Sequence, residues 1–202
     1  MKKPNSRHAN SPVRQKQIIQ AALACFSEKG FTETSISDIC QRANASTGSV
    51  YHHFKSKEKL AAAVYLEGIQ DYQTGLMDTL EKQKHARDGI HEVVHYHLKW
   101  VENNPDWSGF LFQKRYAEFM GGTEDDMNQL NMEFMRRVSK WFKKHIEAGT
   151  LKPLPGDIFI SILLGPCQEY VRLYTSGNAS SSVEKAANDI ASAAWRALGN
   201  EG

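Results

Sequence analysis

The chain has 202 residues, of which 41% are hydrophobic and 24% charged, and this composition excludes a largely disordered protein. Its longest apolar run, residues 60–66, is far shorter than the ~20 residues of a membrane-spanning helix, and its three cysteines are too few for a disulfide framework, so we expect a cytoplasmic protein. The net charge of +2 divides into +6 on residues 1–59 and −4 on residues 60–202, which fits either a head that binds a polyanion or a solvated basic face.

The first part of the chain predicts an arm followed by helices. Residues 1–11 are polar and show no period, so we expect a flexible basic arm there. From Val13, apolar residues recur with helical spacing until Gly30, which is expected to end the first helix. Ser35 and Asp38 have the spacing of a capping box, which predicts the start of a short second helix.

A tight turn is expected between the second helix and a third. Asn44 tolerates the left-handed backbone conformation that such a turn requires. Ser46 is placed to cap a short helix that continues through Phe54, and Ser56 is placed to cap a long fourth helix that extends to about Gln83.

All later segments also predict helices. Apolar residues recur every three or four positions in each of them, and prolines or glycines separate them. No segment alternates between apolar and polar residues with a period of two, so we expect an all-α fold of about nine helices. The five later helices are expected at residues 87–103, 107–120, 125–148, 157–174 and 182–198.

Two short helices joined by a tight turn in a basic segment describe a helix-turn-helix, with the motif at about residues 35–54. Over residues 13–66 the sequence resembles the N-terminal domain of TetR-family transcriptional regulators. The residues that carry the resemblance are Gly30-Phe31, Thr34 to Ile39, Ala43, Ser46, Gly48 to Glu58 and Leu60.

The resemblance implies both a division of the chain and a function. A helix-turn-helix domain would cover residues 12–66, and an effector-binding and dimerisation domain would cover residues 67–202. Members of the family are homodimeric, sequence-specific DNA-binding regulators, usually repressors that a small molecule releases from a palindromic operator. The implied partners are double-stranded DNA, a small effector and a second copy of the chain, with no cofactor, no metal and no enzymatic activity.

The residues expected to contact DNA lie in and around the third helix. Gly48 has no Cβ, so the helix can lie close to DNA, and the polar side chains beside it lie where backbone N–H groups favour phosphates and base edges. Tyr51 and His52 are long enough to reach phosphates, and the family pattern places Lys57 against the DNA backbone. The full set is Ser35, Ser46, Thr47, Gly48, Ser49, Tyr51, His52, Lys55 and Lys57.

Two positions depart from the family pattern, and two others have a structural alternative. Thr47 stands where the family often has lysine, which removes a cation and leaves a hydroxyl that can read a base edge. Asn44 stands where glycine is more usual, but it still permits the turn. Tyr51 and His53 could instead complete the core of a three-helix bundle.

The sequence His91-Glu92-Val93-Val94-His95 matches the H-E-x-x-H pattern, in which two histidines bind zinc and a glutamate acts as a general base. On a helical wheel, however, His91 and His95 fall at the edge of the apolar arc, and no third ligand lies near enough to complete a site. A metal-dependent hydrolase is therefore a weakly supported alternative function. A helical adaptor that binds proteins instead of DNA is a second alternative.

The middle of the chain is rich in aromatic residues and methionine, which suit the walls of a cavity for a largely apolar ligand. His97 lies within an apolar arc, where it either orients a ligand or is a core histidine with satisfied nitrogens. The aromatic stripes could equally be ordinary core. The expected ligand-binding residues are His97, Trp100, Phe110, Phe119 and Phe134.

The last two expected helices carry stripes of apolar and small residues. Because small residues let helices approach closely, we expect these two helices to form a homodimer, although the stripes could also close the core of one chain. The stripes are Ile158, Ile162, Gly165, Glu169 and Arg172 on one helix and Val183, Ala187, Ile190, Ala191, Ala194 and Leu198 on the other.

Overall fold

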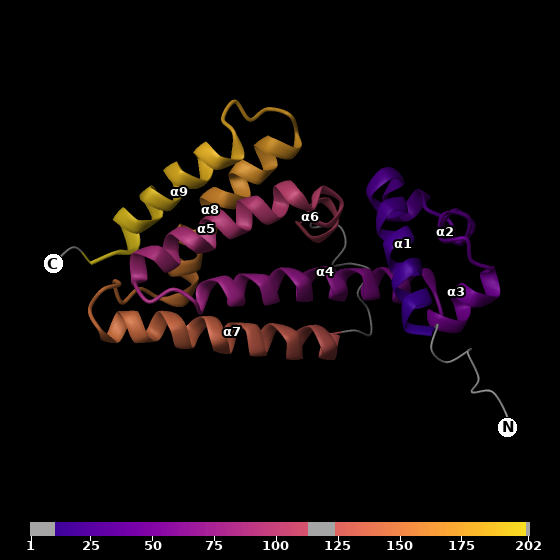
Figure 1. Ribbon diagram of the computed structural model, residues 1–202, viewed down its shortest axis with the longest axis horizontal. Helices are drawn as coiled ribbons and strands as arrows, with labels where there is room; N and C mark the ends of the chain where they lie inside the picture. Colours follow the sequence, from indigo (N-terminus) through magenta and orange to yellow (C-terminus); the bar gives the residue numbers. More distant parts are fainter. Residues whose placement is uncertain (1–10, 113–123, 201–202) are drawn as a thin grey trace, which may run out of the picture. The chain divides into compact units, whose positions relative to one another are not determined.

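The computed structural model describes residues 11–112 and 124–200, and in these ranges it contains helices and one isolated β-bridge, but no strand. The prediction of an all-α fold is confirmed. No helix in these ranges is long and apolar enough to cross a membrane. The helices are α1 (Ser11–Glu33), α2 (Ile36–Ala43), α3 (Thr47–His53), α4 (Lys57–Leu80), α5 (Ala86–Asn103), α6 (Pro105–Phe112), α7 (Glu124–Glu147), α8 (Gly156–Thr175) and α9 (Val183–Leu198) (Figure 1).

The helices form two compact units. The first contains α1, α2, α3, α4 up to Ile69 and α6 from Asp106. The second contains α4 from Gln70, α5, α8, α9 and α7 from Asn128. Helix α4 is thus shared between the units, and α6 belongs with the helix-turn-helix, whereas the sequence placed this segment in the second domain.

Local backbone chemistry sets the helix-turn-helix of the first unit. Helical dihedral angles break at Gly30, whose φ of 79° lies in the left-handed range. The Asp38 N–H donates to Ser35 Oγ at 3.1 Å and the Ser35 N–H donates to Asp38 Oδ2 at 2.8 Å, so the predicted capping box is present. Asn44 adopts the left-handed conformation, with φ of 45°, and turns the chain from α2 toward α3 as predicted.

The core of the first unit joins α1 to the other helices. Val50 of α3 is fully buried, and Phe26 of α1 stacks on Phe110 of α6 with the ring centroids 5.7 Å apart. The Ser27 hydroxyl donates to Asp106 Oδ1 at 2.9 Å and adds a polar link between the same two helices. Phe110 is therefore a core residue of the first unit, where it packs against the helix-turn-helix domain.

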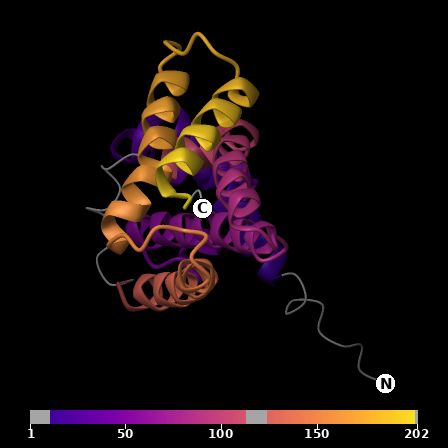
Figure 2. The same ribbon diagram turned by 90° about the vertical axis from the view of Figure 1, so that its left-hand side faces the viewer.

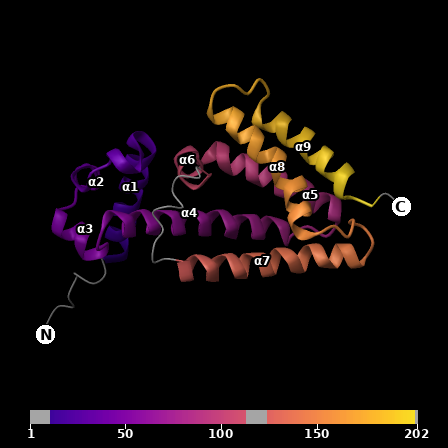
Figure 3. The same cartoon turned by 180° about the vertical axis from the view of Figure 1, so that it is seen from behind.

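In the second unit, α5 packs along α9 and against α8, while α8 also packs against α9 (Figure 2). The second half of α4 lies beside α7 (Figure 3). Gln73 Nε2 donates to Asn131 Oδ1 at 2.9 Å across these two helices, and Arg137 forms a 2.6 Å ion pair with Glu81, directly after α4.

The small residues of α9 face the core of the second unit. Val183, Ala187, Ala191, Ala194 and Leu198 are each at most 5% exposed. These five residues of the predicted stripe pack within a single chain, whereas Ile190 of the same stripe is half-buried. Helix α8 differs, because its predicted stripe includes Ile158, which is 46% exposed, and Gly165, Glu169 and Arg172, which are also exposed.

Candidate nucleic-acid interface and ligand cavity

The N-terminus of α3 is held by its cap and is otherwise open. Ser46 precedes the helix in an extended conformation, and its Oγ accepts the Ser49 N–H at 3.1 Å. Thr47 and Gly48 are exposed. A Cβ built on Gly48 would meet only Ser46 Oγ, at 4.0 Å, so packing within the chain does not require a glycine there. Because glycine has no side chain, a partner can approach the backbone of α3 closely at this position.

The remaining polar side chains of α3 also lie on the surface. Tyr51 is 47% exposed, and His52 and Lys55 are exposed, so Tyr51 does not complete a core. His53 is half-buried, and its partial burial lowers the pKa of its imidazole, as does the nearby His52. Lys55 makes no ion pair with the described residues, which leaves its charge available at the end of the helix.

Besides Ser46, two of the expected contact residues, Ser35 and Thr47, interact with neighbouring residues of the chain. Ser35 forms the capping box of α2, and its hydroxyl also donates to Asp38 Oδ2 at 2.6 Å. Hydrogen bonds from Lys29 and Ser35 hold the pKa of the Asp38 carboxyl well below its usual range. The Thr47 hydroxyl lies 3.8 Å from the Cys40 thiol, which connects the start of α3 to α2.

Lys57 has a different environment from the one that its sequence pattern implies. Its Nζ donates to the carbonyl oxygens of Phe31 and Thr34, each at 2.9 Å, and to that of Thr32 at 3.4 Å. The same ammonium lies 4.4 Å from the centroid of the Phe31 ring. An ammonium has three N–H donors, so these carbonyls account for all of them. In this structure Lys57 ties the start of α4 to the segment between α1 and α2.

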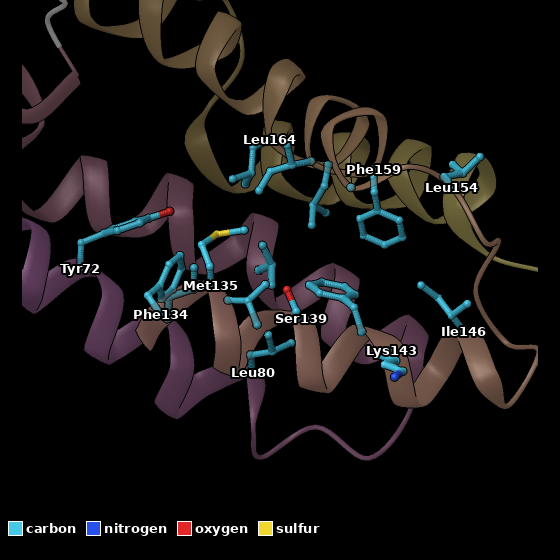
Figure 4. A pocket seen from close by; sticks show the side chains of 17 residues that line it. Tyr72, Leu80, Phe134, Met135, Ser139, Lys143, Ile146, Leu154, Phe159 and Leu164 are labelled. Atoms are coloured by element: carbon cyan, nitrogen blue, oxygen red, sulfur yellow. The ribbon is translucent and has the colours of Figure 1, made fainter. Parts of the chain in front are cut away.

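The second unit contains a cavity of about 250 Å³ between α4, α5, α7 and α8 (Figure 4). Most of its lining atoms belong to aliphatic and aromatic side chains. The polar side chains that reach it are Tyr72, Ser139 and Lys143. The lining residues are Tyr72, Leu76, Leu80, Val93, Phe134, Met135, Val138, Ser139, Phe142, Lys143, Ile146, Leu154, Gly156, Phe159, Ile160, Leu163 and Leu164.

Of the five residues expected to bind a ligand, only Phe134 lines this cavity. His97 lies behind the wall, with its Nδ1 2.7 Å from the hydroxyl of Tyr72, and burial lowers the pKa of its imidazole to about 4. Trp100 packs edge-on against Tyr72 and donates from Nε1 to Asp71 at 3.1 Å. Phe110 belongs to the first unit, and Phe119 lies outside the described residues.

Sequence reasoning missed the walls that α4 and α8 contribute. Tyr72 lies in the segment predicted only as a long fourth helix, and Phe159 and Leu163 lie on a helix interpreted as an oligomer surface. An apolar stripe shows only that a helix face is covered. It does not show whether protein or ligand covers it.

The H-E-x-x-H sequence lies on α5, as expected. Within residues 11–112 and 124–200, no group of three or more histidine, cysteine, aspartate or glutamate side chains is arranged to hold a metal ion. Burial lowers the pKa of His91, and the neighbouring charge of Arg87 lowers it further.

Two family profiles together match most of the chain. Residues 18–64 match the profile described as bacterial regulatory proteins, tetR family, and residues 65–199 match the tetracyclin repressor-like C-terminal domain. The HTH-type transcriptional regulator LuxR of Vibrio harveyi is 26% identical over 73% of this chain and 71% of its own length. IcaR of Staphylococcus aureus, the negative transcriptional regulator of the biofilm operon icaADBC, is 24% identical over 62% of this chain and 68% of its own.

A solved structure shares the fold. The crystal structure of a TetR family transcription regulator from Marinobacter aquaeolei VT8 superposes with a TM-score of 0.77. The alignment covers 98% of this chain and 100% of that one at 16% sequence identity. At this identity the similarity shows a common fold and does not identify the ligand or the operator.

Proposed function

Because the chain belongs to the TetR family of bacterial regulatory proteins, we propose that it represses transcription from a palindromic operator and that a small, largely apolar ligand releases it. It is a DNA-binding regulator and not an enzyme, and the family matches give no support to a hydrolase or a protein adaptor. Like other members of the family, it binds operator DNA, dimerises and binds a small effector. We place its action in the cytoplasm, with the DNA that it binds.

The exposed N-terminal end of α3 is the observation that carries this proposal. Thr47 and Gly48 are open to a partner, and the adjoining Ser49 is half-exposed, so α3 can enter the major groove with these residues toward base edges. Tyr51, His52 and Lys55 follow on the exposed surface, where they can reach phosphates. Ser35 and Ser46 contribute chiefly as helix caps, and Lys57 as a residue that positions the helices.

The proposed dimer uses the outward surface of α8 with the exposed residues of α9. Ile158 and Gly165 present an apolar and a small residue on α8, and Glu169 and Arg172 continue the same face with a 2.6 Å ion pair. Because a two-fold axis relates the two protomers, their two α3 helices would meet two half-sites of a palindrome.

The proposed effector site is the cavity between α4, α5, α7 and α8. It is a partly open, largely apolar space with a few polar groups, which is the usual composition of a small-molecule site. Helix α4 forms one of its walls through Tyr72, Leu76 and Leu80, and the same helix begins at Lys57 in the first unit.

Selection of DNA from a random duplex pool by the purified protein tests the proposal. We expect enrichment of a sequence with two-fold symmetry. Thr47→Ala should then relax discrimination at one or two symmetry-related positions, by about 1–3 kcal/mol for each base that the threonine reads. Thr74→Ala, at an exposed position of α4 in the second unit, is the matched control and should bind as the parent does. A pool without an enriched sequence would refute DNA recognition.

A further inference from the structure

The only charged side chain among the described residues that line the cavity is Lys143 of α7. Apart from the hydroxyl of Ser139 and that of Tyr72, which is paired with neutral His97, the rest of the described lining is aliphatic and aromatic. Burying an ion among such groups is strongly unfavourable unless an opposite charge accompanies it. Among the described lining residues that are open to water, only Lys143 carries a charge, so a negatively charged group on a ligand is most favourably placed beside Lys143.

Helical geometry places Lys143 between two different faces of α7. Ser139, Phe142 and Ile146 line the cavity, whereas Lys140 and Lys144 line a second, more open hollow on the surface of the same unit. Lys143 lines both. The aliphatic stem of a lysine can pack on apolar walls while its ammonium stays in water, and the 74% exposure of this side chain fits that arrangement (Figure 4).

The surface hollow beside the cavity is basic. Its lining includes four cations, Arg137, Lys140, Lys143 and Lys144, against two carboxylates, Glu81 and Glu147, which gives a net charge of +2. Glu81 is occupied by Arg137, which donates to both of its oxygens at 2.6 and 3.0 Å. Glu147 lies 3.7 Å from Lys143, which is a loose contact between exposed groups. Lys140 and Lys144 form no ion pair with the described residues. The potential at this end of the cavity therefore favours an anion.

We propose that the effector is an anionic amphiphile, with an apolar chain that fills the cavity and a carboxylate or phosphate head that pairs with Lys143. This inference rests on the proposed function, since it names the ligand class of the same effector site. Lys140 and Lys144 raise the local concentration of such ligands, and the walls of α4, α7 and α8 select an unbranched or flexible chain over a bulky polar molecule.

Displacement of N-phenyl-1-naphthylamine, a neutral fluorescent probe of apolar sites, from the full chain tests the proposal. The competitors are decanoate, decyl phosphate, decanol and decylamine, which share a chain and differ only in the head. We expect both anions to compete more strongly than decanol, and decylamine to compete least. Lys143→Gln should weaken decanoate about fivefold and leave decanol unchanged. Lys140→Gln, which removes a charge from the hollow alone, is the matched control and should have a smaller effect.

Each outcome bears on a different part of the proposal. If both anions compete more strongly than decanol, the result supports the proposal. The tighter of decanoate and decyl phosphate then identifies the preferred head group. Equal competition by decanol and decanoate, with no effect of Lys143→Gln, would overturn the assignment of an anionic head and leave an apolar effector in place. If the probe binds and no member of the series displaces it, the chain-shaped ligand is also refuted. Absence of probe binding, together with operator affinity that no amphiphile changes, would contradict the proposed effector site itself.

Discussion

Lys57 lies at the start of α4. The sequence pattern predicts that it contacts the DNA backbone, whereas in the structure its ammonium donates to backbone carbonyl groups of the same chain. The pattern identifies the residue because the family motif has a lysine there. Its contacts depend on where the backbone goes after Gly30, since that break brings the carbonyl groups of Phe31 and Thr34 within reach of its ammonium. The sequence thus predicts that a lysine occupies this position of the motif, but it does not predict which groups a long, flexible side chain contacts.

A comparison of Lys57→Met with Lys55→Met separates positioning from phosphate contact. Methionine keeps most of the apolar stem and removes the ammonium. We expect Lys57→Met to lower the free energy of unfolding by about 1–2 kcal/mol and to weaken operator binding, with the salt dependence unchanged. Lys55→Met should instead reduce the slope of log K against log salt by ~2 units, because a dimer uses the residue twice. An equal reduction of the slope in Lys57→Met would show that its ammonium contacts phosphate.

His97 makes stability depend on pH in a defined direction. Its imidazole is held neutral, with a pKa lowered to about 4 by burial, whereas the unfolded chain has an ordinary histidine pKa of ~6.5. The unfolded state therefore takes up a proton first as the pH falls. The contribution of His97 is complete above pH ~6.5 and is lost between about 6.5 and 4, with a total of up to about 3 kcal/mol.

Urea unfolding of His97→Gln across this pH range measures that contribution. The variant should be less stable than the parent at pH 7, but it should lose less stability than the parent does when the pH falls to 5. His95→Gln, at a half-exposed position on the same helix, provides the comparison. Parallel pH dependences for the parent and His97→Gln would contradict a neutral buried imidazole.

At the scale of helices, the sequence predicts where a helix begins, because caps depend on neighbouring residues. It does not predict which surface a helix face packs against. The caps of α2 and α3 depend on residues three positions apart, so Ser35, Asp38 and Ser46 predicted them correctly. The small residues of α9 suit any close helix contact, and nothing in their spacing distinguishes α5 of the same chain from a second copy. Ala187 and Ala191 are buried within the chain, whereas Ile158 and Gly165 are exposed, so the proposed dimer surface is centred on α8.

Gly165→Glu tests the dimer surface of α8. The chain leaves open space around a Cβ at this position, and glutamate favours a helix more than glycine does, so the monomer should fold at least as well as the parent. In the proposed dimer the same side chain brings two like charges to a close helix contact. Light scattering should therefore show monomers, and operator affinity should fall although α3 is untouched. Gly165→Ala should remain dimeric, and a dimer of unchanged stability in Gly165→Glu would rule out this face.

At the scale of the whole chain, one helix belongs to both units. Helix α4 carries Lys57 in the first unit and, in the second, three residues of one cavity wall, Tyr72, Leu76 and Leu80. A ligand that changes the position of its second half therefore acts on an element that is continuous with the helix-turn-helix domain. By linkage, a ligand that lowers operator affinity by some factor must itself bind more weakly, by the same factor, to the operator complex.

Gln70→Gly, at an exposed position where α4 passes from one unit to the other, should weaken that coupling. Glycine in a helix interior costs about 1 kcal/mol relative to alanine and loosens the helix locally, without removing a residue from either site. We expect operator affinity without ligand, and ligand affinity without DNA, to stay within about twofold of the Gln70→Ala control. The ratio of operator affinities with and without saturating ligand should move toward one, because a loosened helix transmits less of the displacement. If Gln70→Gly and Gln70→Ala keep the same ratio, α4 is not the element that carries the effector signal.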